Sequence, residues 1–361
     1  METLRAASGF NLANGHALPK RHVDVRGTVY DDSAMTPSAS WSRALAAAIA
    51  RRGPDITTTS TVYRLCDGRG DDTPGLYLDR YGPAAVLSVY DDAGLDEKAV
   101  TTHAREVLEQ LTPTGCEAVY VKPFRKDRSR LGGQAPSEAT SPTPRAGTPM
   151  PDALVVDEHG VKFEARLWDG FSTGLFPEHR EHRRALATGG VTRALNLFAY
   201  TCGFSVPLAL SGAAVTNVDV SARYLEWGKR NHALNGIADE AVRYKRMDSL
   251  TYLKWAARQT DERYDLIILD PPTFGAGDKR RGVKPWSAVK DYPALLQAAA
   301  AVLIEGGAIF AATNARTLAS GDGLRDLIDD VFPRVKWLTL PPWPADVRER
   351  GRVASALFTI R

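Results

Sequence analysis

Three aspartates that each close a short apolar run are the residues in this sequence best placed to do chemistry. Asp219, Asp248 and Asp270 stand at the ends of successive segments whose composition is typical of strands. A carboxylate at the tip of such a strand can accept hydrogen bonds from ribose hydroxyls, and ligands of open α/β sheets bind at the carboxyl ends of the strands. The pattern therefore predicts a site for a nucleoside-like ligand at one edge of a parallel sheet.

The first of these aspartates completes a strand, glycine turn, helix and strand in the segment 194–219. Gly203 in the turn would let the backbone come close to a ligand at the helix N-terminus. The segment lacks G-x-G-x-x-G and G-x-x-x-x-G-K-[ST], which disfavours a pyrophosphate-binding dehydrogenase and a P-loop enzyme. A ligand that carries a ribose without a phosphate fits better, and S-adenosylmethionine (SAM) is the common example. An ordinary βαβ unit in which Asp219 only caps a strand is the alternative.

The sequence Asp270-Pro271-Pro272-Thr273-Phe274 predicts a second half of the site. Two prolines make a rigid turn with few N–H donors, so the Asp270 side chain and the backbone carbonyls are directed outward. Such a loop can accept hydrogen bonds from a flat base, and Phe274 can stack on that base. We therefore take Asp270, Pro271, Pro272 and Phe274 as the candidate catalytic residues.

The elements that must position these residues alternate between strands and helices from about residue 168 onward. This alternation predicts a doubly wound, Rossmann-like α/β domain over 168–361, with about seven strands and an antiparallel C-terminal edge. Residues 54–167 predict a small α+β accessory domain, interrupted at 131–152 by a segment rich in Gly, Pro, Ser and Thr that we expect to be a flexible loop. Residues 1–53 predict an N-terminal extension with one helix, over 41–52.

The composition is that of an ordinary globular protein, with 43% hydrophobic residues, 25% charged residues and a net charge of +3. The overall charge therefore does not indicate a nucleic-acid binder. Basic residues are nevertheless clustered near the candidate site, and a solvated charged face is the alternative to RNA binding for each cluster. The clusters lie at 125–130, at 180–184 and at 279–281.

The cysteines Cys66, Cys116 and Cys202 have neither the spacing of a metal site nor that of a disulfide framework, which fits a reducing cytosol. The N-terminal residues show no basic segment followed by an apolar one, and no apolar run is long enough to span a bilayer. We expect a cytoplasmic protein without a metal and without a membrane partner. A monomer and a homodimer are both compatible with the sequence.

Several stretches resemble the SAM-dependent methyltransferases that modify bacterial large-subunit ribosomal RNA. They are NLFAYTCGFSVPLALSGAAVTNVDVSARYLEWGKRNHALNG, LDPPTFGAGDKR and, at 173–180, TGLFPEHR. The resemblance covers about residues 55–361 and includes two branches, the cytosine-C5 enzymes and the guanine-N7 half of a fused guanine methyltransferase. The chain departs from the family at Pro177 and Glu178, where Leu and Asp are usual. Its first residues also do not resemble the PUA domain that opens the cytosine branch.

The resemblance implies a role for each motif residue. Phe198, Tyr200 and Gly203 would line the methionine and ribose end of SAM, Asp219 would hold the ribose, and Asp248 would accept from the adenine amino group. Asp270 would lie beside the sulfonium and the target base. The full set predicted to bind SAM is Phe176, Arg180, Asn196, Phe198, Tyr200, Gly203, Asp219, Val220, Asp248, Ser249 and Asp270. The set predicted to bind RNA is Arg125, Lys126, Arg128, Arg130, Lys279, Arg280 and Arg281.

The atom that receives the methyl group depends on whether a thiol is available, because methylation of pyrimidine C5 needs a cysteine thiolate to attack C6. In the cytosine branch a cysteine follows the strand after the D-P-P loop, whereas here 308–312 is followed by Thr313 and Asn314, which resemble the Ser-Asn-Asn stretch of the guanine-N7 branch. We expect Cys202 to be a packed residue. A ring nitrogen such as guanine N7, in ribosomal RNA or a ribosomal particle, is the predicted target. A small-molecule methyltransferase and a non-catalytic RNA-binding protein are the alternatives.

Overall fold

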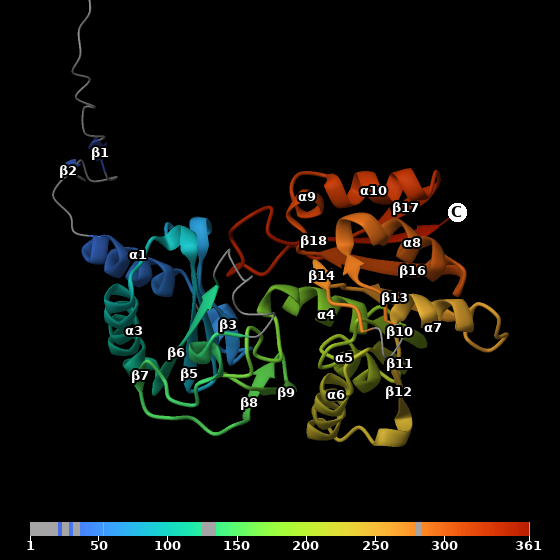
Figure 1. Cartoon of the computed structure of the whole chain (residues 1–361), viewed down its shortest axis with the longest axis horizontal. Coiled ribbons are helices and arrows are strands. Elements are labelled where there is room, and N and C mark those ends of the chain that lie inside the picture. The colour runs from blue at the N-terminus through green and yellow to red at the C-terminus, as the bar shows by residue number, and fades with distance from the viewer. Residues whose placement is uncertain are drawn as a thin grey trace, which may run out of the picture.

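The computed structural model describes residues 21–23, 29–31, 37–52, 54–124, 135–278 and 283–360. Within these ranges the chain forms a smaller domain, blue to green in Figure 1, and a larger domain, green to red. A short antiparallel hairpin, β1 (Arg21–Val23) and β2 (Val29–Asp31), precedes them. The predicted RNA-binding residues lie outside the described residues, so those contacts stay predictions: Arg125, Lys126, Arg128, Arg130, Lys279, Arg280 and Arg281.

The larger domain is built on a seven-stranded sheet in the order β12-β11-β10-β13-β16-β18-β17. The first five strands run parallel, while β18 is antiparallel to both β16 and β17. This arrangement confirms the Rossmann-like doubly wound sheet and its antiparallel edge. The strands are β10 (Arg193–Leu197), β11 (Ala214–Asp219), β12 (Val242–Arg246), β13 (Tyr264–Leu269), β16 (Leu303–Thr313), β17 (Val335–Leu338) and β18 (Ala354–Ile360).

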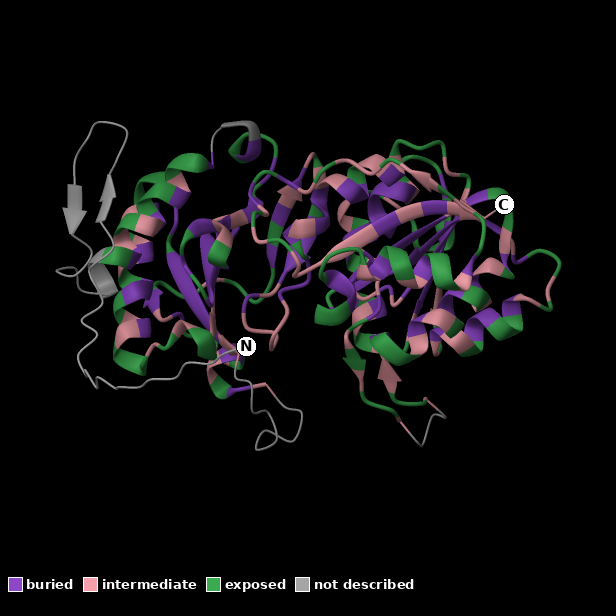
Figure 2. Ribbon diagram, turned by 90° about the horizontal axis from the view of Figure 1, so that it is seen from above, coloured by how far each residue is buried: buried purple, intermediate pink, exposed green. Residues whose placement is uncertain are grey.

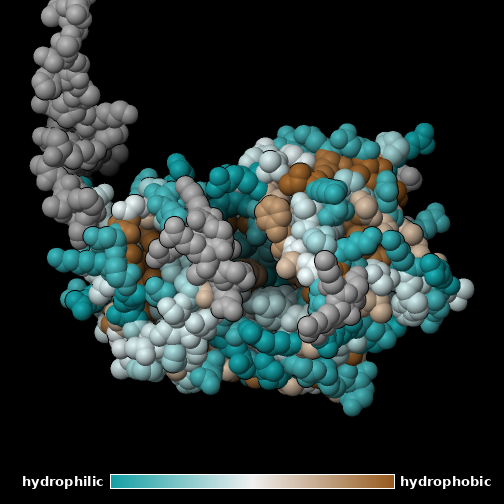
Figure 3. Space-filling model, in the orientation of Figure 1, coloured by the Kyte–Doolittle hydropathy of each residue, from teal (hydrophilic) through white to brown (hydrophobic). Residues whose placement is uncertain are grey.

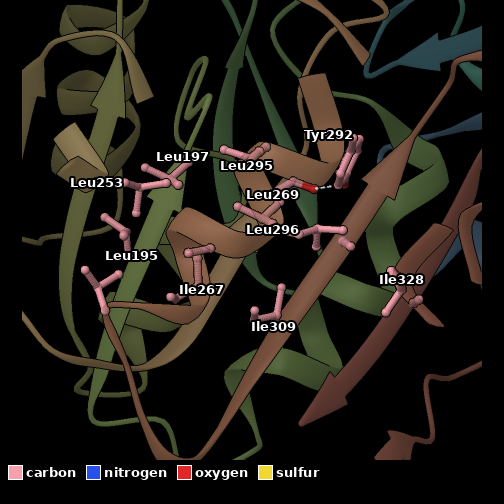
Figure 4. Packing of buried hydrophobic residues seen from close by; sticks show 14 of the residues in the cluster. Leu195, Leu197, Leu253, Ile267, Leu269, Tyr292, Leu295, Leu296, Ile309 and Ile328 are labelled. Carbon is pink, nitrogen blue, oxygen red and sulfur yellow. Dashed lines mark hydrogen bonds between the residues drawn. The ribbon is translucent and has the colours of Figure 1, made fainter. Parts of the chain in front are cut away.

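Helices cover both faces of this sheet because successive side chains of a strand point to opposite faces, and Figure 2 shows the buried strands between these helices. On one face Leu195, Ile267 and Ile309 form a row across β10, β13 and β16, and this row packs under α7 and α8 (Figure 4). The other face packs Ile268 and Phe310 against α4 and α5. The helices are α4 (Arg180–Ala187), α5 (Ser205–Leu210), α6 (Ala222–Leu234), α7 (Ser249–Ala256), α8 (Ala288–Ala300), α9 (Arg316–Ala319) and α10 (Gly323–Val331).

A buried tyrosine fixes the edge of the sheet where the candidate site is expected. The hydroxyl of Tyr292 in α8 lies 3.2 Å from the carbonyl oxygen of Leu269 and 2.9 Å from that of Ala312. These two carbonyls belong to residues at the ends of β13 and β16, so the hydroxyl links α8 to the carboxyl ends of both strands. No helix in the described part of the chain is both long and apolar enough to cross a membrane.

The smaller domain contains a five-stranded sheet in the order β3-β4-β5-β6-β7, with α1 and α3 packed on one face. Its core includes Trp41, Leu45 and Ala48 of α1, so this helix belongs to the small domain and not to a separate N-terminal extension. An amphipathic helix of this kind needs a partner for its apolar side. The elements are α1 (Pro37–Arg51), α2 (Pro54–Thr57), α3 (Glu97–Leu111), β3 (Val62–Asp67), β4 (Leu76–Tyr81), β5 (Ala84–Tyr90), β6 (Ala118–Phe124) and β7 (Ala146–Gly147).

The segment 131–152 differs from the expected flexible loop in the part that the structure describes, from residue 135 onward. It contains a 3-10 helix at Ser137–Thr140 and the strand β7, which pairs with β6. The Tyr120 hydroxyl donates to the carbonyl of Pro142 at 3.1 Å and accepts from the N–H of Met150 at 3.0 Å. Contacts with distant residues thus hold a segment whose local composition favours no regular structure.

Two segments connect the domains. One is the hairpin of β8 (Leu154–Glu158) and β9 (Val161–Ala165), which lies between the domains in Figure 1 and packs with residues of both. The loop 339–353 between β17 and β18 returns to the small domain. There Asp346 is fully buried and accepts from both Nη atoms of Arg180, at 2.6 and 3.1 Å, and from the backbone N–H of Arg64 at 2.8 Å. The mutual orientation of the domains therefore depends on buried charges.

Candidate active site

The carboxyl ends of the parallel strands bring the three aspartates to one edge of the sheet. The order β12-β11-β10-β13-β16 places Asp248, Asp219 and Asp270 along this edge in that sequence. The ends of β11 and β12 are also linked directly, since the N–H of Met247 donates to the carbonyl of Asp219 at 3.1 Å. The grouping predicted from the strand ends is therefore present in the fold.

The loop after β10 has an unusual backbone. Phe198, Tyr200 and Cys202 all adopt positive φ, at 55°, 48° and 64°. Left-handed conformations of non-glycine residues cost on the order of 1–3 kcal/mol each and cluster at ligand sites. Nothing in the sequence signals this. Gly203 itself does not have a positive φ, and a Cβ added there would make an ordinary contact of 3.4 Å with Leu175.

Asp219 holds this loop in place. One carboxylate oxygen accepts from the N–H of Tyr200 at 2.9 Å and the other from the N–H of Ser221 at 2.8 Å. Burial raises the pKa of Asp219, against the lowering effect of these two hydrogen bonds. Each carboxylate oxygen has a further lone pair, so the group can still accept from the two hydroxyls of a ribose.

Apolar side chains are exposed beside Asp219. Val220 and Met247, which follow β11 and β12, are both exposed, as is Phe176. The Phe176 ring lies 5.8 Å from that of Tyr200, which in turn contacts Tyr224. Exposed apolar groups around a strand-end carboxylate provide what a nucleoside needs, a flat surface for the base and acceptors for the ribose, so these residues fit SAM.

Asp248 is the N-cap of α7, and one of its carboxylate oxygens is occupied by hydrogen bonds within the helix. Its Oδ1 accepts from the N–H and the hydroxyl of Thr251, both at 2.9 Å, as an N-cap. A hydrogen bond from an adenine amino group would therefore fall to Oδ2. Ser249, the first residue of α7, is buried.

Two of the predicted cofactor residues have other partners. Asn196 is buried and donates to the hydroxyl of Ser205 at 2.7 Å and to Asn217 at 3.2 Å. Arg180 is buried against Asp346, so the basic cluster at 180–184 is not an open charged face at this position. Buried polar groups need partners inside the protein, and local sequence does not reveal which ones. These contacts do not support direct cofactor binding by either side chain.

The D-P-P loop is braced by residues that sequence reasoning did not include. The Thr273 hydroxyl donates to Oδ1 of Asn314 at 2.5 Å, which joins the loop to the end of β16. The indole N–H of Trp286 donates to the carbonyl of Pro272 at 2.8 Å, and its ring lies 5.2 Å from that of Phe198. Trp286 begins β15 (Trp286–Ser287), which pairs with β14 (Phe274–Gly275). The carbonyl of Pro272 is thus already engaged, and no local pattern pointed to Trp286.

Pro271 and Phe274 of the D-P-P loop differ in their exposure. Pro271 is buried, whereas the side chain of Phe274 is 74% exposed. A ring in this position is free to cover one face of a base.

Asp270 lies in an environment that disfavours its charged form. Burial raises its pKa to about 7, nearby Glu178 adds to this effect, and Arg183 opposes it. Oε2 of Glu178 is buried without a hydrogen-bond partner among the described residues, and Arg64 of the small domain lies 3.7 Å away. Strongly shifted carboxyl groups of this kind are typical of functional sites.

The three thiols are all buried, and burial raises the pKa of each, that of Cys66 to about 12. Cys202 packs against α6, where a Cβ added to Gly228 would lie only 2.3 Å from its sulfur. A reactive cysteine needs exposure and a lowered pKa. The geometry therefore supports the interpretation of Cys202 as a packed residue.

Comparison with known proteins gives related sequences over most of the chain. Ribosomal RNA large subunit methyltransferase K/L of Pseudoalteromonas translucida is 35% identical over 71% of this chain. Ribosomal RNA large subunit methyltransferase K of Neisseria meningitidis serogroup B is 33% identical over 75% of it. The aligned region spans 35% of the length of the first relative and 73% of the second.

Solved structures share the fold. SMU.776, crystallised with SAH, superposes with a TM-score of 0.75 at 24% identity, covering 94% of this chain and 86% of that one. A SAM-dependent methyltransferase from Agrobacterium tumefaciens gives a TM-score of 0.56 at 21% identity, covering 83% and 88%. Residues 98–344 match the family described as S-adenosylmethionine-dependent methyltransferase. The chain therefore belongs to the SAM-dependent methyltransferase family, and SAM is its cofactor.

Proposed function

We propose that the protein methylates a base of large-subunit ribosomal RNA and that the acceptor is a ring nitrogen, with guanine N7 favoured over cytosine C5. The observation that carries this proposal is the D-P-P loop at the end of β13, where Asp270 and the exposed Phe274 stand in a site without an accessible thiol. The names of the relatives, ribosomal RNA large subunit methyltransferases K/L and K, support the substrate. This substrate agrees with the predicted cytoplasmic location.

SAM supplies an activated methyl group when bound, and the residues of the chain hold both reactants. Asp219 would accept from the ribose, Val220 and Met247 would pack beside the adenine, and Asp248 would accept from its amino group. An ionised Asp270 can accept from N1–H and the 2-amino group of a guanine, which lie on the edge opposite N7. Holding that edge leaves N7 open, with Phe274 stacked on the ring.

A ring nitrogen already carries a lone pair, so this reaction needs orientation and exclusion of water but no covalent intermediate. Methylation at cytosine C5 would require one of three buried thiols, each with a raised pKa, to reach the base. The burial of the cysteines therefore favours the nitrogen.

The deciding experiment is mass mapping of ribosomal RNA from cells with and without the gene. We expect one methylated guanine of the large-subunit RNA to be lost on deletion, and to return with the parent gene but not with Asp270→Asn. Assays on naked RNA and on ribosomal particles would then identify the form of the substrate. An unchanged methylation map, together with methyl transfer to a small molecule, would contradict the proposal.

SAM affinity should fall when Asp219 is replaced by alanine, because the ribose hydroxyls and two loop N–H groups lose their acceptor. We expect a loss of about 1–3 kcal/mol, the penalty for unpaired buried polar groups. Calorimetry measures it, with Asp239→Ala as the matched control, since exposed Asp239 precedes β12 at the opposite edge of the sheet. Equal affinities of both variants would remove Asp219 from the site.

Turnover should not depend on a cysteine. Cys202→Ser is expected to keep methyl transfer within about tenfold of the parent, which corresponds to about 1.4 kcal/mol of barrier. The variant is assayed beside Cys66→Ser and Cys116→Ser, and RNA containing 5-fluorocytosine is tested for a covalent adduct. An adduct that disappears in Cys202→Ser would restore the cytosine assignment.

A further inference from the structure

Four aromatic side chains on the small domain and the linker after it form a continuous row, here called the aromatic row: Tyr77, Tyr90, Phe124 and Phe171. Neighbouring ring centres lie 5.3, 4.7 and 5.2 Å apart, and the rings of Tyr90 and Phe124 are stacked within 9° of parallel. None of the four belongs to a hydrophobic core cluster of the described residues. Tyr77 is buried, whereas Tyr90, Phe124 and Phe171 are only partly buried, so these three rings are in part accessible to solvent.

The aromatic row lies on the face of the small sheet that is directed toward the larger domain. The opposite face carries the core under α1 and α3, which includes Leu76 and Val121. On the same face as the row, the hydroxyl of Tyr81 lies 3.2 Å from the carbonyl of Leu175, and Arg64 lies 3.7 Å from Glu178. Glu178 is the carboxylate that affects Asp270. Figure 3 shows the molecule hollowed between its two halves.

Cations accompany the row at both ends. Arg352, from the loop 339–353, lies 3.7 Å over the centre of Tyr77 and donates to the hydroxyl of Tyr90 at 3.2 Å. Its Nη1 is buried and finds no acceptor in the described part of the chain. Lys122 donates to the carbonyl of Ser172, beside Phe171, at 2.8 Å. Burial lowers the pKa of Lys122 to about 7, so Arg352 is the cation that stays charged at physiological pH.

Rings combined with cations in this way are typical of surfaces that bind single-stranded nucleic acid, in which bases stack on the aromatic faces and phosphates contact the cations. An enzyme that acts on a base must also take that base out of its stack. The neighbouring bases then lose a stacking partner, and an aromatic side chain can replace it.

We propose that the aromatic row is a stacking platform for the single-stranded RNA that flanks the target nucleotide, with Arg352 bound to its phosphate backbone. This inference rests on the proposed function, because it takes RNA to be the substrate. It assigns the small domain a direct part in holding the substrate strand opposite Asp270.

The platform predicts that loss of a ring weakens RNA binding without affecting SAM. Tyr90→Ala and Phe124→Ala should each lower the affinity for single-stranded RNA about tenfold or more. This is the usual loss of affinity when one base can no longer stack on an aromatic ring. Tyr90→Phe and Phe124→Trp should retain it. Trp255→Ala is the matched control, since Trp255 is an exposed aromatic residue on α7 of the larger domain. SAM affinity close to that of the parent shows that each variant is folded.

Two further readouts distinguish stacking from charge. RNA that carries 2-aminopurine should lose fluorescence on binding to the parent protein, and Tyr90→Ala should restore the signal. Arg352→Gln should flatten the salt dependence of binding by about one unit, whereas the ring variants should keep the parent slope. An absence of quenching by the parent overturns the platform even if a variant fails to fold.

The failure of this inference can be told from the failure of the proposed function. If the parent methylates RNA while Tyr90→Ala and Phe124→Ala bind RNA normally, the platform is excluded and the proposed function stands. If the parent binds SAM but neither binds nor methylates RNA, both are excluded.

Discussion

Replacing Asp270 by asparagine should nearly abolish methyl transfer while SAM remains bound. Asparagine keeps the size of the side chain but cannot present two carboxylate oxygens to the edge of a guanine. Loss of one such preorganised electrostatic contact in other enzymes costs about 10²–10³ in kcat, and we expect a similar fall. The assay follows transfer of labelled methyl groups to RNA at saturating SAM.

The matched control is Asp261→Asn, because exposed Asp261 lies before the amino end of the same strand, β13. Turnover by this control should equal that of the parent. If Asp270→Asn also turned over normally, Asp270 would have no part in holding the base, and the D-P-P loop would have to act through its backbone alone.

The pKa of Asp270 adds a dependence on pH to this expectation. Since burial and Glu178 raise that pKa to about 7, the ionised form that holds the base increases through neutral pH. The rate of the parent should therefore rise between acidic and mildly alkaline pH. Glu178→Gln removes a negative neighbour and should shift the midpoint of the profile to lower pH, which a pH series of kcat/KM would show.

The same carboxyl group should make the stability of the folded protein decrease as pH rises, whereas the rate should increase. A pKa that is higher in the folded state than in the unfolded state means that the stabilising contribution is complete below the unfolded value and is lost as pH rises toward 7. Asp270→Asn should therefore be more stable than the parent at pH 8, by about 1–3 kcal/mol, and the difference should vanish under acidic conditions. Urea denaturation at both pH values measures it.

Replacing Asp346 by alanine should cause the largest loss of stability. The carboxylate is fully buried and holds the Arg180 guanidinium and the backbone N–H of Arg64. Its removal leaves a buried cation without a partner, which typically costs 3–5 kcal/mol, so we expect about that decrease in the free energy of unfolding. Asp330→Ala, an exposed position on α10, is the control.

A double variant separates the charge from the packing at this position. If the loss in Asp346→Ala comes from the unpaired guanidinium, Arg180→Met combined with Asp346→Leu should recover a large part of the stability, because apolar groups of similar volume often replace buried ion pairs well. A decrease below about 1 kcal/mol in Asp346→Ala, the range of exposed pairs, would show that water reaches Arg180.

The fold and part of the site follow from the sequence because both depend on local patterns. Apolar runs at regular intervals predicted the seven-stranded sheet, and the aspartates that close them predicted the edge where ligands bind. The partner of Arg180 could not be predicted, since Asp346 is 166 residues away. The positive φ of Phe198, Tyr200 and Cys202 also has no local signal, and the N–H of Tyr200 in this loop is held by Asp219, 19 residues later in the chain.

Other differences have the same origin. The helix over 41–52 was recognised, but its place in the small-domain core depends on distant strands. Trp286 reaches the D-P-P loop through the pairing of β14 with β15, which no motif specifies.

The return of the loop 339–353 to the small domain has a consequence for synthesis of the protein. Oδ1 of Asp67 in β3 accepts from Arg64 of the same strand, whereas Oδ2 accepts from the N–H groups of Arg348 and Glu349, which lie 281 and 282 residues later in the chain. At about 5–20 residues per second the ribosome needs on the order of tens of seconds to cover that distance. During this time Oδ2 of Asp67 lacks these two N–H donors. The domain that is translated first is therefore completed last, after the loop 339–353 has emerged from the ribosome.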